Sequence, residues 1–169
     1  MSKKLDPKLV QDLIRQWLYE EEFKIQSITD PKAHFNILAE DKYNKKVNIA
    51  QPKIRKDQIT INAAAKLLES QKEELVKMDE QERNKLFWQM RLSLINKNVG
   101  FSPIKLPLDH VRISQGIYYD GLTKDAFFQR MFVVRRTLLL VMWMIERALG
   151  VGEPSEILQD FEESLFYVS

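Results

Sequence analysis

The first segment of the chain has the apolar spacing of an α-helix. Asp6 precedes Pro7, which is typical of a helix start because aspartate caps the first backbone N–H groups and proline lacks one. Apolar residues then recur every three or four positions and form one stripe, which comprises Leu9, Val10, Leu13, Ile14, Trp17 and Leu18. The pattern predicts an amphipathic helix over residues 5–22.

From residue 23 the period changes to two, which is typical of antiparallel strands with one wet face. The apolar phase predicts strands over 23–27, 35–39, 47–49 and 59–63, with the end of the fourth near Ala64. The polar phase, which we expect to face solvent, comprises Lys24, Gln26, His34, Asn36, Asn48, Thr60 and Asn62. Turn residues at 29–32 and 41–45 separate the strands, so a meander is predicted.

The pattern returns to helix over residues 65–98, in two pieces. Asp79 to Glu82 has the spacing of a capping box and starts the second piece. The residues that we expect on its inward side are Leu86, Phe87, Met90, Leu94 and Ile95. Two extended runs follow at 101–106 and 111–119.

Thr123 has the position of a cap for a last long helix, which we expect to run to about Leu149, before Gly150. Beyond it, the spacing of Ile157, Phe161 and Leu165 predicts a short docked helix over about 154–167. The sequence therefore predicts one α+β domain over 1–169 with its core in about 5–150. It has an antiparallel sheet of about five to six strands with helices packed on it, in the order α-β-β-β-(β)-α-β-β-α.

The most apolar run, Leu138 to Ile145, is apolar on every side of the predicted helix. Spanning a membrane takes about 20 apolar residues, and charged residues flank this shorter run, so spanning is excluded. A helix without a polar face needs cover on more than one side. That cover is the domain itself, a homodimer seam or a cofactor, and Met142, Trp143 and Met144 are the candidate contacts with a partner.

Composition narrows the function classes. Lys and Arg number 26 against 24 Asp and Glu, so bulk charge does not indicate a nucleic-acid or membrane partner. The absence of cysteine excludes disulfides, thiolate metal sites and cysteine nucleophiles. The first residues lack the apolar run of a signal peptide, and together with the composition this predicts a cytoplasmic protein.

No residue constellation predicts catalysis or a bound cofactor. The two histidines are His34, in the polar phase of a strand, and His110, which follows Asp109 in a loop. An Asp-His pair can orient an imidazole, but no nucleophile or oxyanion motif accompanies it, and no phosphate-binding glycine motif is present. We therefore expect a protein that is not an enzyme and has no metal or cofactor.

A basic segment suggests an alternative function. Its residues are Lys42, Tyr43, Lys45, Lys46, Lys53, Arg55 and Lys56. Lysines beside an aromatic ring are suited to phosphate contact and base stacking, so nucleic-acid binding is the alternative hypothesis. The simpler interpretation is that these charges keep exposed strands from pairing with other chains.

Two stretches, LDPKLVQDLIRQWLYEEEF and VRISQGIYYDGLTKDAFFQRMFVVRRTLLLVMWMIE, resemble an uncharacterised archaeal family with a type III secretion chaperone-like fold. The resemblance covers roughly residues 5–150. It implies a homodimeric, chaperone-like adaptor that holds a segment of a client protein. This chain is slightly basic, whereas secretion chaperones tend to be acidic. The resemblance names no catalytic residues, client or biological process.

Overall fold

The computed structural model describes residues 5–150 of the chain. Its elements are α1 (Pro7–Glu20), β1 (Lys24–Ser27), β2 (Ala33–Glu40), β3 (Lys46–Pro52), β4 (Gln58–Lys66), α2 (Glu69–Lys77), α3 (Glu80–Asn96), β5 (Gly100–Phe101), β6 (His110–Tyr118), a 3-10 turn (Tyr119–Gly121) and α4 (Lys124–Leu149). The predicted α+β class and element order are confirmed, with a six-stranded sheet in the order β1-β2-β3-β4-β6-β5. The predicted helix over 154–167 lies outside the described residues.

The described residues form two compact units. The first contains the chain up to Asn62 together with Gln115–Phe132, and the second contains Ala63–Ser114 and α4 from Val133 onward. The strands β4 and β6 and the helix α4 therefore contribute residues to both units.

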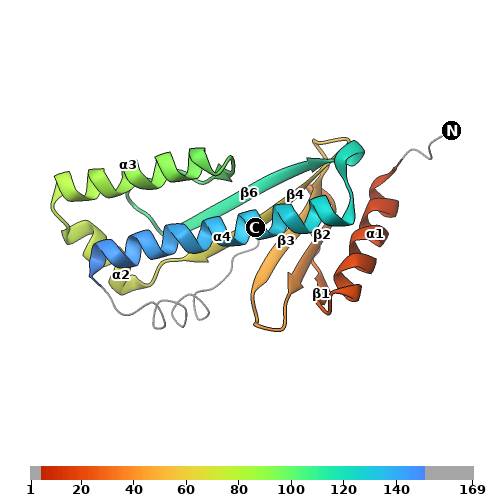
Figure 1. The fold of residues 1–169 in the computed structure, drawn as a ribbon, viewed down its shortest axis with the longest axis horizontal. Coiled ribbons are helices and arrows are strands. Elements are labelled where there is room, and N and C mark those ends of the chain that lie inside the picture. Colours follow the sequence, from red (N-terminus) through yellow and green to blue (C-terminus); the bar gives the residue numbers. More distant parts are fainter. Residues whose placement is uncertain (1–4, 151–169) are drawn as a thin grey trace. The chain divides into compact units, whose positions relative to one another are not determined.

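In the first unit, α1 packs on β1 and β2 (Figure 1). Its buried side chains are Val10, Ile14 and Leu18, which belong to the predicted apolar stripe. Asp6 caps the helix by accepting a hydrogen bond from the Leu9 N–H at 2.9 Å, as predicted. Three isoleucines on neighbouring strands, Ile37, Ile49 and Ile61, stand in register and are fully buried, so one face of this sheet region forms the core.

The prediction of a wet face on these strands is wrong for Asn36 and Asn48, which are 5% and 2% exposed. The Asn48 side-chain amide donates to the Asn36 side-chain oxygen and, at 3.2 Å, to the Ile37 carbonyl. Asn62 donates to the Asn48 side-chain oxygen at 3.4 Å. A ladder of asparagines across three strands satisfies these amides, because each has both a donor and an acceptor group.

The start of α4 is tied to α1 within the first unit. Thr123 accepts a hydrogen bond from the Ala126 N–H at 3.1 Å, which confirms the predicted cap. The Lys124 ammonium lies 2.8 Å from Glu20 and 2.9 Å from Glu21, at the end of α1. The rings of Trp17 and Phe127 lie 5.9 Å apart, so aromatic packing accompanies the ion pairs.

In the second unit, α2 and α3 meet at a tight junction. Asp79 caps α3 by accepting hydrogen bonds from the N–H groups of Gln81 and Glu82, at 3.1 and 3.3 Å. Arg83 donates to three carbonyls at the end of α2, those of Leu75, Val76 and Met78, at 3.1 to 3.3 Å. The two helix ends are therefore closed by one anionic and one cationic side chain, in the orientation that helix dipoles favour.

Two sequence predictions for this unit need correction. Leu86, Phe87, Met90 and Leu94 are buried as predicted, but Ile95 is 65% exposed and does not belong to the inward side of α3. The predicted strand over 101–106 is mostly irregular, since β5 covers only Gly100 and Phe101. Proline at 103 and 107 prevents a longer ladder, because proline has no N–H to donate.

The second half of α4 contains the apolar run. Leu138, Val141, Met142 and Ile145 are buried by the chain itself, while Leu139, Leu140 and Met144 are half-buried. Trp143 remains 38% exposed. Across the described residues, no helix combines the length and apolar character that crossing a membrane requires. The chain therefore supplies cover for one side of this helix, and the opposite side stays partly open.

Candidate functional site

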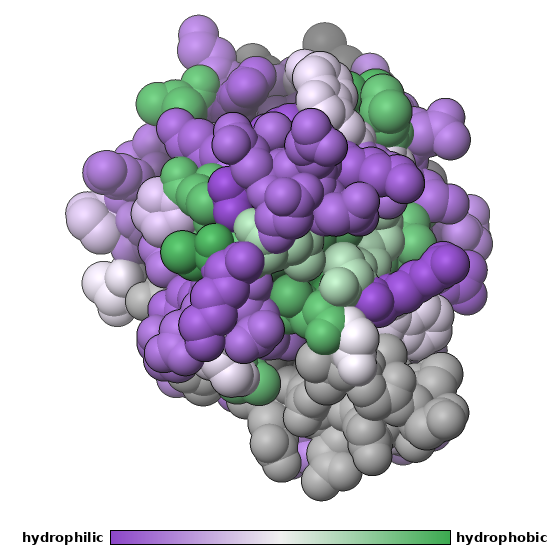
Figure 2. All heavy atoms as spheres, turned by 90° about the vertical axis from the view of Figure 1, so that its left-hand side faces the viewer, coloured by the Kyte–Doolittle hydropathy of each residue, from purple (hydrophilic) through white to green (hydrophobic). Residues whose placement is uncertain are grey.

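The second unit contains a groove between α3 and α4. We call it the α3–α4 groove, and it has a volume of about 590 Å³. Its lining residues are Met78, Asp79, Glu82, Lys85, Leu86, Gln89, Met144, Arg147 and Ala148. Figure 2, which faces this end of the unit, shows pale green side chains at the centre and purple ones around them. Clefts of about 300–1,000 Å³ are of the size that binds small ligands.

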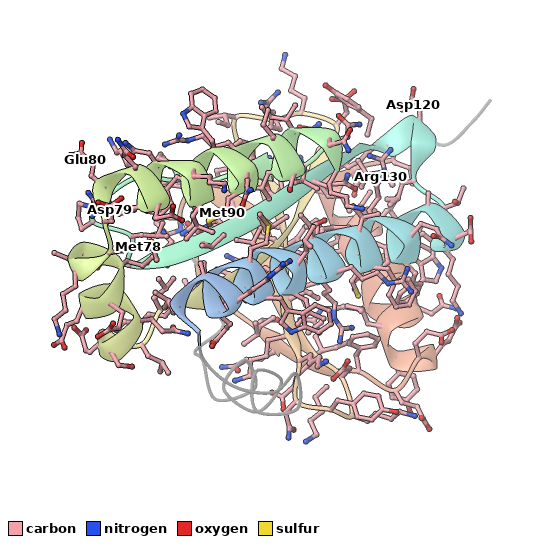
Figure 3. All side chains as sticks on the ribbon, turned by 60° about the vertical axis from the view of Figure 1, so that its left-hand side comes forward. Met78, Asp79, Glu80, Met90, Asp120 and Arg130 are labelled. Atoms are coloured by element: carbon pink, nitrogen blue, oxygen red, sulfur yellow. The ribbon has the colours of Figure 1, made fainter. Side chains whose placement is uncertain are left out.

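The groove combines an apolar floor with charged margins. Met78, Leu86, Met144 and Ala148 supply the apolar surface, and methionine adapts its shape to different contacts. Figure 3 shows Met78 and Asp79 together at the junction of α2 and α3, while Met90 points from α3 into the interior. The floor is suited to apolar side chains of a ligand.

The charges at the margins are two carboxylates and two cations. The Asp79 carboxylate is engaged in capping α3. Within residues 5–150, neither Lys85 nor Arg147 makes an ion pair. These cations are available to a carboxylate of a bound segment. No nucleophile with an adjacent base is among the residues that line the groove.

The outward face of α3 is apolar as well. Trp88, Leu92 and Ile95 are 60%, 60% and 65% exposed, and their spacing of four and three residues places them on one side of the helix. We call these three residues the outer stripe. Arg91 borders it, with its guanidinium carbon 5.4 Å from the centre of the Trp88 ring. Exposed apolar groups gathered on one face mark interaction sites, whereas scattered ones need no explanation.

Sequence reasoning missed the outer stripe because α3 is apolar on two opposite sides. The inward residues carry the helical period, and the same period includes Ile95. The spacing of four and three residues between Trp88, Leu92 and Ile95 is the signal in the sequence that identifies a second apolar side.

The predicted partner contacts Met142, Trp143 and Met144 fall in three different environments. Met142 is buried in the unit at 3% exposure, Trp143 is partly exposed, and Met144 lines the α3–α4 groove. Consecutive positions on a helix point about 100° apart, which explains the separation. Of the three, Trp143 and Met144 have surface that a partner can contact.

The basic segment is divided by β3. Lys42, Tyr43 and Lys45 lie in the turn before this strand, and Lys46 is its first residue. Lys53, Arg55 and Lys56 follow the end of the strand. Seven strand residues span about 23 Å, so a ligand would have to be that long to contact both groups. Asp41 holds the first turn by accepting hydrogen bonds from the N–H groups of Tyr43 and Lys45, at 2.8 and 2.9 Å.

The Asp109-His110 pair does not form a catalytic arrangement. The Asp109 carboxylate lies 3.5 Å from the Lys72 ammonium, and His110 is exposed at the start of β6. His34 is exposed on β2. Over the part of the chain that is described, no cluster of three or more histidine and acidic side chains is arranged to hold a metal ion.

The sequence and the fold were compared with those of known proteins. Residues 10–145 match the family described as an uncharacterized conserved protein, DUF2299. The chain belongs to this family. The structure is similar to the crystal structure of an uncharacterized protein from Methanothermobacter thermautotrophicus, with a TM-score of 0.76 and 28% sequence identity. The match covers 83% of this chain and 99% of that chain. No curated protein matches the sequence.

These comparisons confirm the predicted resemblance to an uncharacterised archaeal family. The matched range contains α1 from Val10 through most of α4, so it includes the outer stripe and Met144 but ends before Arg147 and Ala148. The family assignment itself carries no activity.

Proposed function

We propose that the chain is a non-enzymatic protein-binding module with a chaperone-like role, and that it forms a homodimer through the outer stripe of α3. The observation that carries the proposal is the exposure of Trp88, Leu92 and Ile95, each at 60% or more, on one side of a helix whose opposite side is already buried. Leaving such a surface in water is unfavourable, since burial of apolar area contributes about 25 cal/mol per Å².

A second copy of the chain suits the outer stripe. In an antiparallel pair of α3 helices, a two-fold axis near Leu92 places Trp88 of one copy close to Ile95 of the other, because both residues are about equally distant from that axis. The same patch then serves both partners, as two-fold symmetry requires. Antiparallel packing also sets the two helix dipoles in opposite directions, which is favourable.

The α3–α4 groove is the proposed contact for a client segment. Its methionines and Leu86 offer an adaptable apolar floor, and Lys85 and Arg147 offer charge at the margin. The helix-in-groove mode fits this geometry, because an amphipathic segment would place apolar anchors on the floor and carboxylates at the edge. On α3 the groove-lining residues Leu86 and Gln89 lie off the outer stripe, whereas Lys85 borders it, seven residues before Leu92, so the proposed dimer and client contacts adjoin each other along the helix.

The decisive experiment is the mass of the full chain in solution, measured by light scattering over a wide range of protein concentration. We expect the mass to approach twice that of one chain as concentration rises. Leu92→Glu should hold the chain as a monomer, because it sets carboxylates opposite each other in the apolar contact. A wild-type mass that stays monomeric at every concentration would refute the homodimer.

Gln89→Glu is the matched control. It adds the same charge to the same helix, but Gln89 lies beside the groove and off the outer stripe. We expect its mass to follow the wild type. If both variants become monomeric to the same degree, the effect reflects general charge on α3, and the stripe is not the contact.

A further inference from the structure

The turn between β3 and β4, residues 53–57, is exposed along its whole length. We call it the β3–β4 turn. Ile54 is 89% exposed, the highest value among the large apolar side chains of residues 5–150. Since β3 lies between β2 and β4 in the sheet, this end of the strand is not a free edge. Protection of an edge against strand pairing therefore does not explain the charges of this turn.

Hydrogen bonds fix the base of the β3–β4 turn. The Arg55 N–H donates to the Pro52 carbonyl at 3.0 Å, which closes a four-residue turn with Ile54 at its third position. The Arg55 carbonyl accepts from the side-chain amide of Gln51, which is fully buried and also accepts from the Tyr119 hydroxyl at 2.8 Å. Turn positions favour glycine, asparagine, aspartate and serine, so turn formation alone does not explain an isoleucine held in water here.

Cations flank the exposed isoleucine on both sides in the sequence. They are Lys53, Arg55 and Lys56. Within residues 5–150 none of their side chains forms an ion pair. Lys32, in the turn between β1 and β2, lies beside them, because its carbonyl accepts a hydrogen bond from the Lys53 N–H at 2.9 Å. The same two turns contain two carboxylates, Asp30 and Asp57, so four cations and two anions leave a local charge of +2.

An apolar apex between cations matches the chemistry of an anionic lipid surface. We propose that the β3–β4 turn docks the protein on anionic membranes, with Ile54 among the acyl chains and the cations at the headgroup phosphates. Binding at such an interface combines buried apolar area with attraction to anionic lipids. The long aliphatic stems of lysine and arginine keep their charges at headgroup level while the apex enters.

A protein or a nucleic acid fits the β3–β4 turn less well. A stable protein interface takes about 800 Å² per partner, whereas this turn presents one apolar side chain, which lipid can surround without a matching pocket. Base stacking uses aromatic rings, and residues 53–57 contain none. Tyr43, the aromatic residue of the basic segment, lies before β3, at the opposite end of the strand. The isoleucine therefore favours lipid as the partner.

Membrane docking goes beyond the protein-binding role and does not depend on it. The outer stripe and the α3–α4 groove both belong to the second unit, whereas the β3–β4 turn belongs to the first. Variants of the turn therefore leave the proposed dimer and client contacts unaltered. A monomeric chain that binds anionic vesicles would refute the homodimer and support the docking turn, so the two proposals fail separately.

Sedimentation of the full chain with sucrose-loaded vesicles measures the binding. One set of vesicles is phosphatidylcholine with about 30 mol% phosphatidylglycerol, and the other is phosphatidylcholine alone. We expect binding to the anionic vesicles only, and we expect it to weaken as salt rises from about 0.1 to 0.5 M, because salt screens exposed charges. Equal binding to both sets, or no binding to the anionic set at low salt, would overturn the proposal.

A pair of charge variants locates the contact. Lys53→Gln with Lys56→Gln should lower the vesicle partition coefficient about twentyfold, since each cation near an anionic surface contributes about fivefold. Lys42→Gln with Lys45→Gln is the matched control, because it removes the same charge from the turn at the other end of β3. We expect the control to lose about threefold or less, since those cations lie farther than a Debye length from the membrane. Equal losses would mean that bulk charge, and not this turn, directs binding.

Insertion of the apex can be observed directly, because the chain has no cysteine of its own. Ile54→Cys carries an environment-sensitive fluorophore at one position, and Tyr43→Cys carries the same fluorophore on the opposite turn as the control. Both positions are exposed, so neither label should disturb the core. With anionic vesicles we expect a blue shift of the emission at position 54 and none at position 43. Bound protein without a shift at position 54, or with equal shifts at both, would overturn the proposed insertion.

Ile54→Ser separates lipid from nucleic acid. It should lower vesicle binding about tenfold by removing the apolar anchor, while Val76→Ser, at an exposed position of α2, should leave it unchanged. The same variants are titrated with a labelled single-stranded oligonucleotide at about 0.1 M salt. Oligonucleotide binding that is lost in Lys53→Gln with Lys56→Gln and retained in Ile54→Ser would identify nucleic acid as the partner of these cations and would overturn membrane docking.

Discussion

Gln71 donates a hydrogen bond to the Glu146 carboxylate at 2.6 Å, and both side chains are buried in the second unit. The oxygen of the same Gln71 amide accepts a hydrogen bond from the Leu68 N–H at 2.9 Å. One residue near the start of α2 therefore joins its own helix start to the last turn of α4. Buried polar groups need such partners, because desolvation without a hydrogen bond is costly.

Gln71→Leu should destabilise the fold by about 1–3 kcal/mol, because it removes a donor to a buried carboxylate and the acceptor for the Leu68 N–H. Urea unfolding followed by circular dichroism measures the loss. Gln81→Leu is the control on an exposed helix position, where we expect a change of about 0.5 kcal/mol or less. Equal losses in the two variants would show that the buried hydrogen bond is not responsible.

The element order was predictable because each period is local. Asp6 with Pro7 and Thr123 mark helix starts through their own backbone contacts, which the sequence displays directly. The alternation around Ile37, Ile49 and Ile61 likewise identifies the buried face of neighbouring strands. Such signals depend on residues within one turn or one strand.

The surfaces could not be predicted in the same way. Asn36 and Asn48 follow the polar phase, yet the ladder that buries them depends on the register of separate strands. Trp88 and Ile95 belong to an apolar helix, and only the packing of the opposite side by Met90 and Leu94 shows that they face outward. A sequence shows which residues are apolar, but their burial depends on contacts with distant parts of the chain.

The asparagine ladder gives a prediction for the first unit. Asn48→Ala should cost about 1–3 kcal/mol in the free energy of unfolding, since it removes the donor to the buried Asn36 side-chain oxygen and a second hydrogen bond to the Ile37 carbonyl. Asn62→Ala removes a half-buried member whose bond to Asn48 is 3.4 Å long, and we expect a smaller loss. The urea midpoints of the two variants measure the difference. A larger loss for Asn62→Ala than for Asn48→Ala would contradict the conclusion that the buried asparagine ladder stabilises the fold.

The junction between α2 and α3 depends on Arg83. Arg83→Gln should destabilise the chain by about 1–2 kcal/mol, because three carbonyls at the end of α2 lose a cationic donor that also complements the helix dipole. Lys77→Gln, which removes an exposed cation from the last turn of α2, is expected to cost about 0.5 kcal/mol or less. If thermal unfolding shows similar losses for both, charge alone explains the effect and the carbonyl contacts do not.

The Tyr119 hydroxyl makes the free energy of unfolding depend on pH at high pH. Its hydroxyl donates to the Gln51 side-chain oxygen at 2.8 Å, and burial, with Asp6 and Asp57 nearby, raises the pKa of Tyr119 from 10.0 to about 12. A pKa that is higher in the folded state means that folding favours the protonated phenol. Its contribution is therefore complete below about pH 10 and is lost as the pH rises from about 10 to 12.

Tyr119→Phe isolates that contribution, because it lacks the titrating hydroxyl but keeps the ring. At about pH 8 we expect the wild type to be more stable than Tyr119→Phe by about 1 kcal/mol, the usual net value of a hydrogen bond. Between about pH 10 and 12 the difference in unfolding free energy should shrink and then reverse, by about 1.4 kcal/mol per pH unit at most. Tyr43→Phe, which removes a phenolic hydroxyl at an exposed position, is the matched control variant. A difference for Tyr119→Phe that stays constant to pH 12 would mean that burial does not oppose ionisation of this phenol.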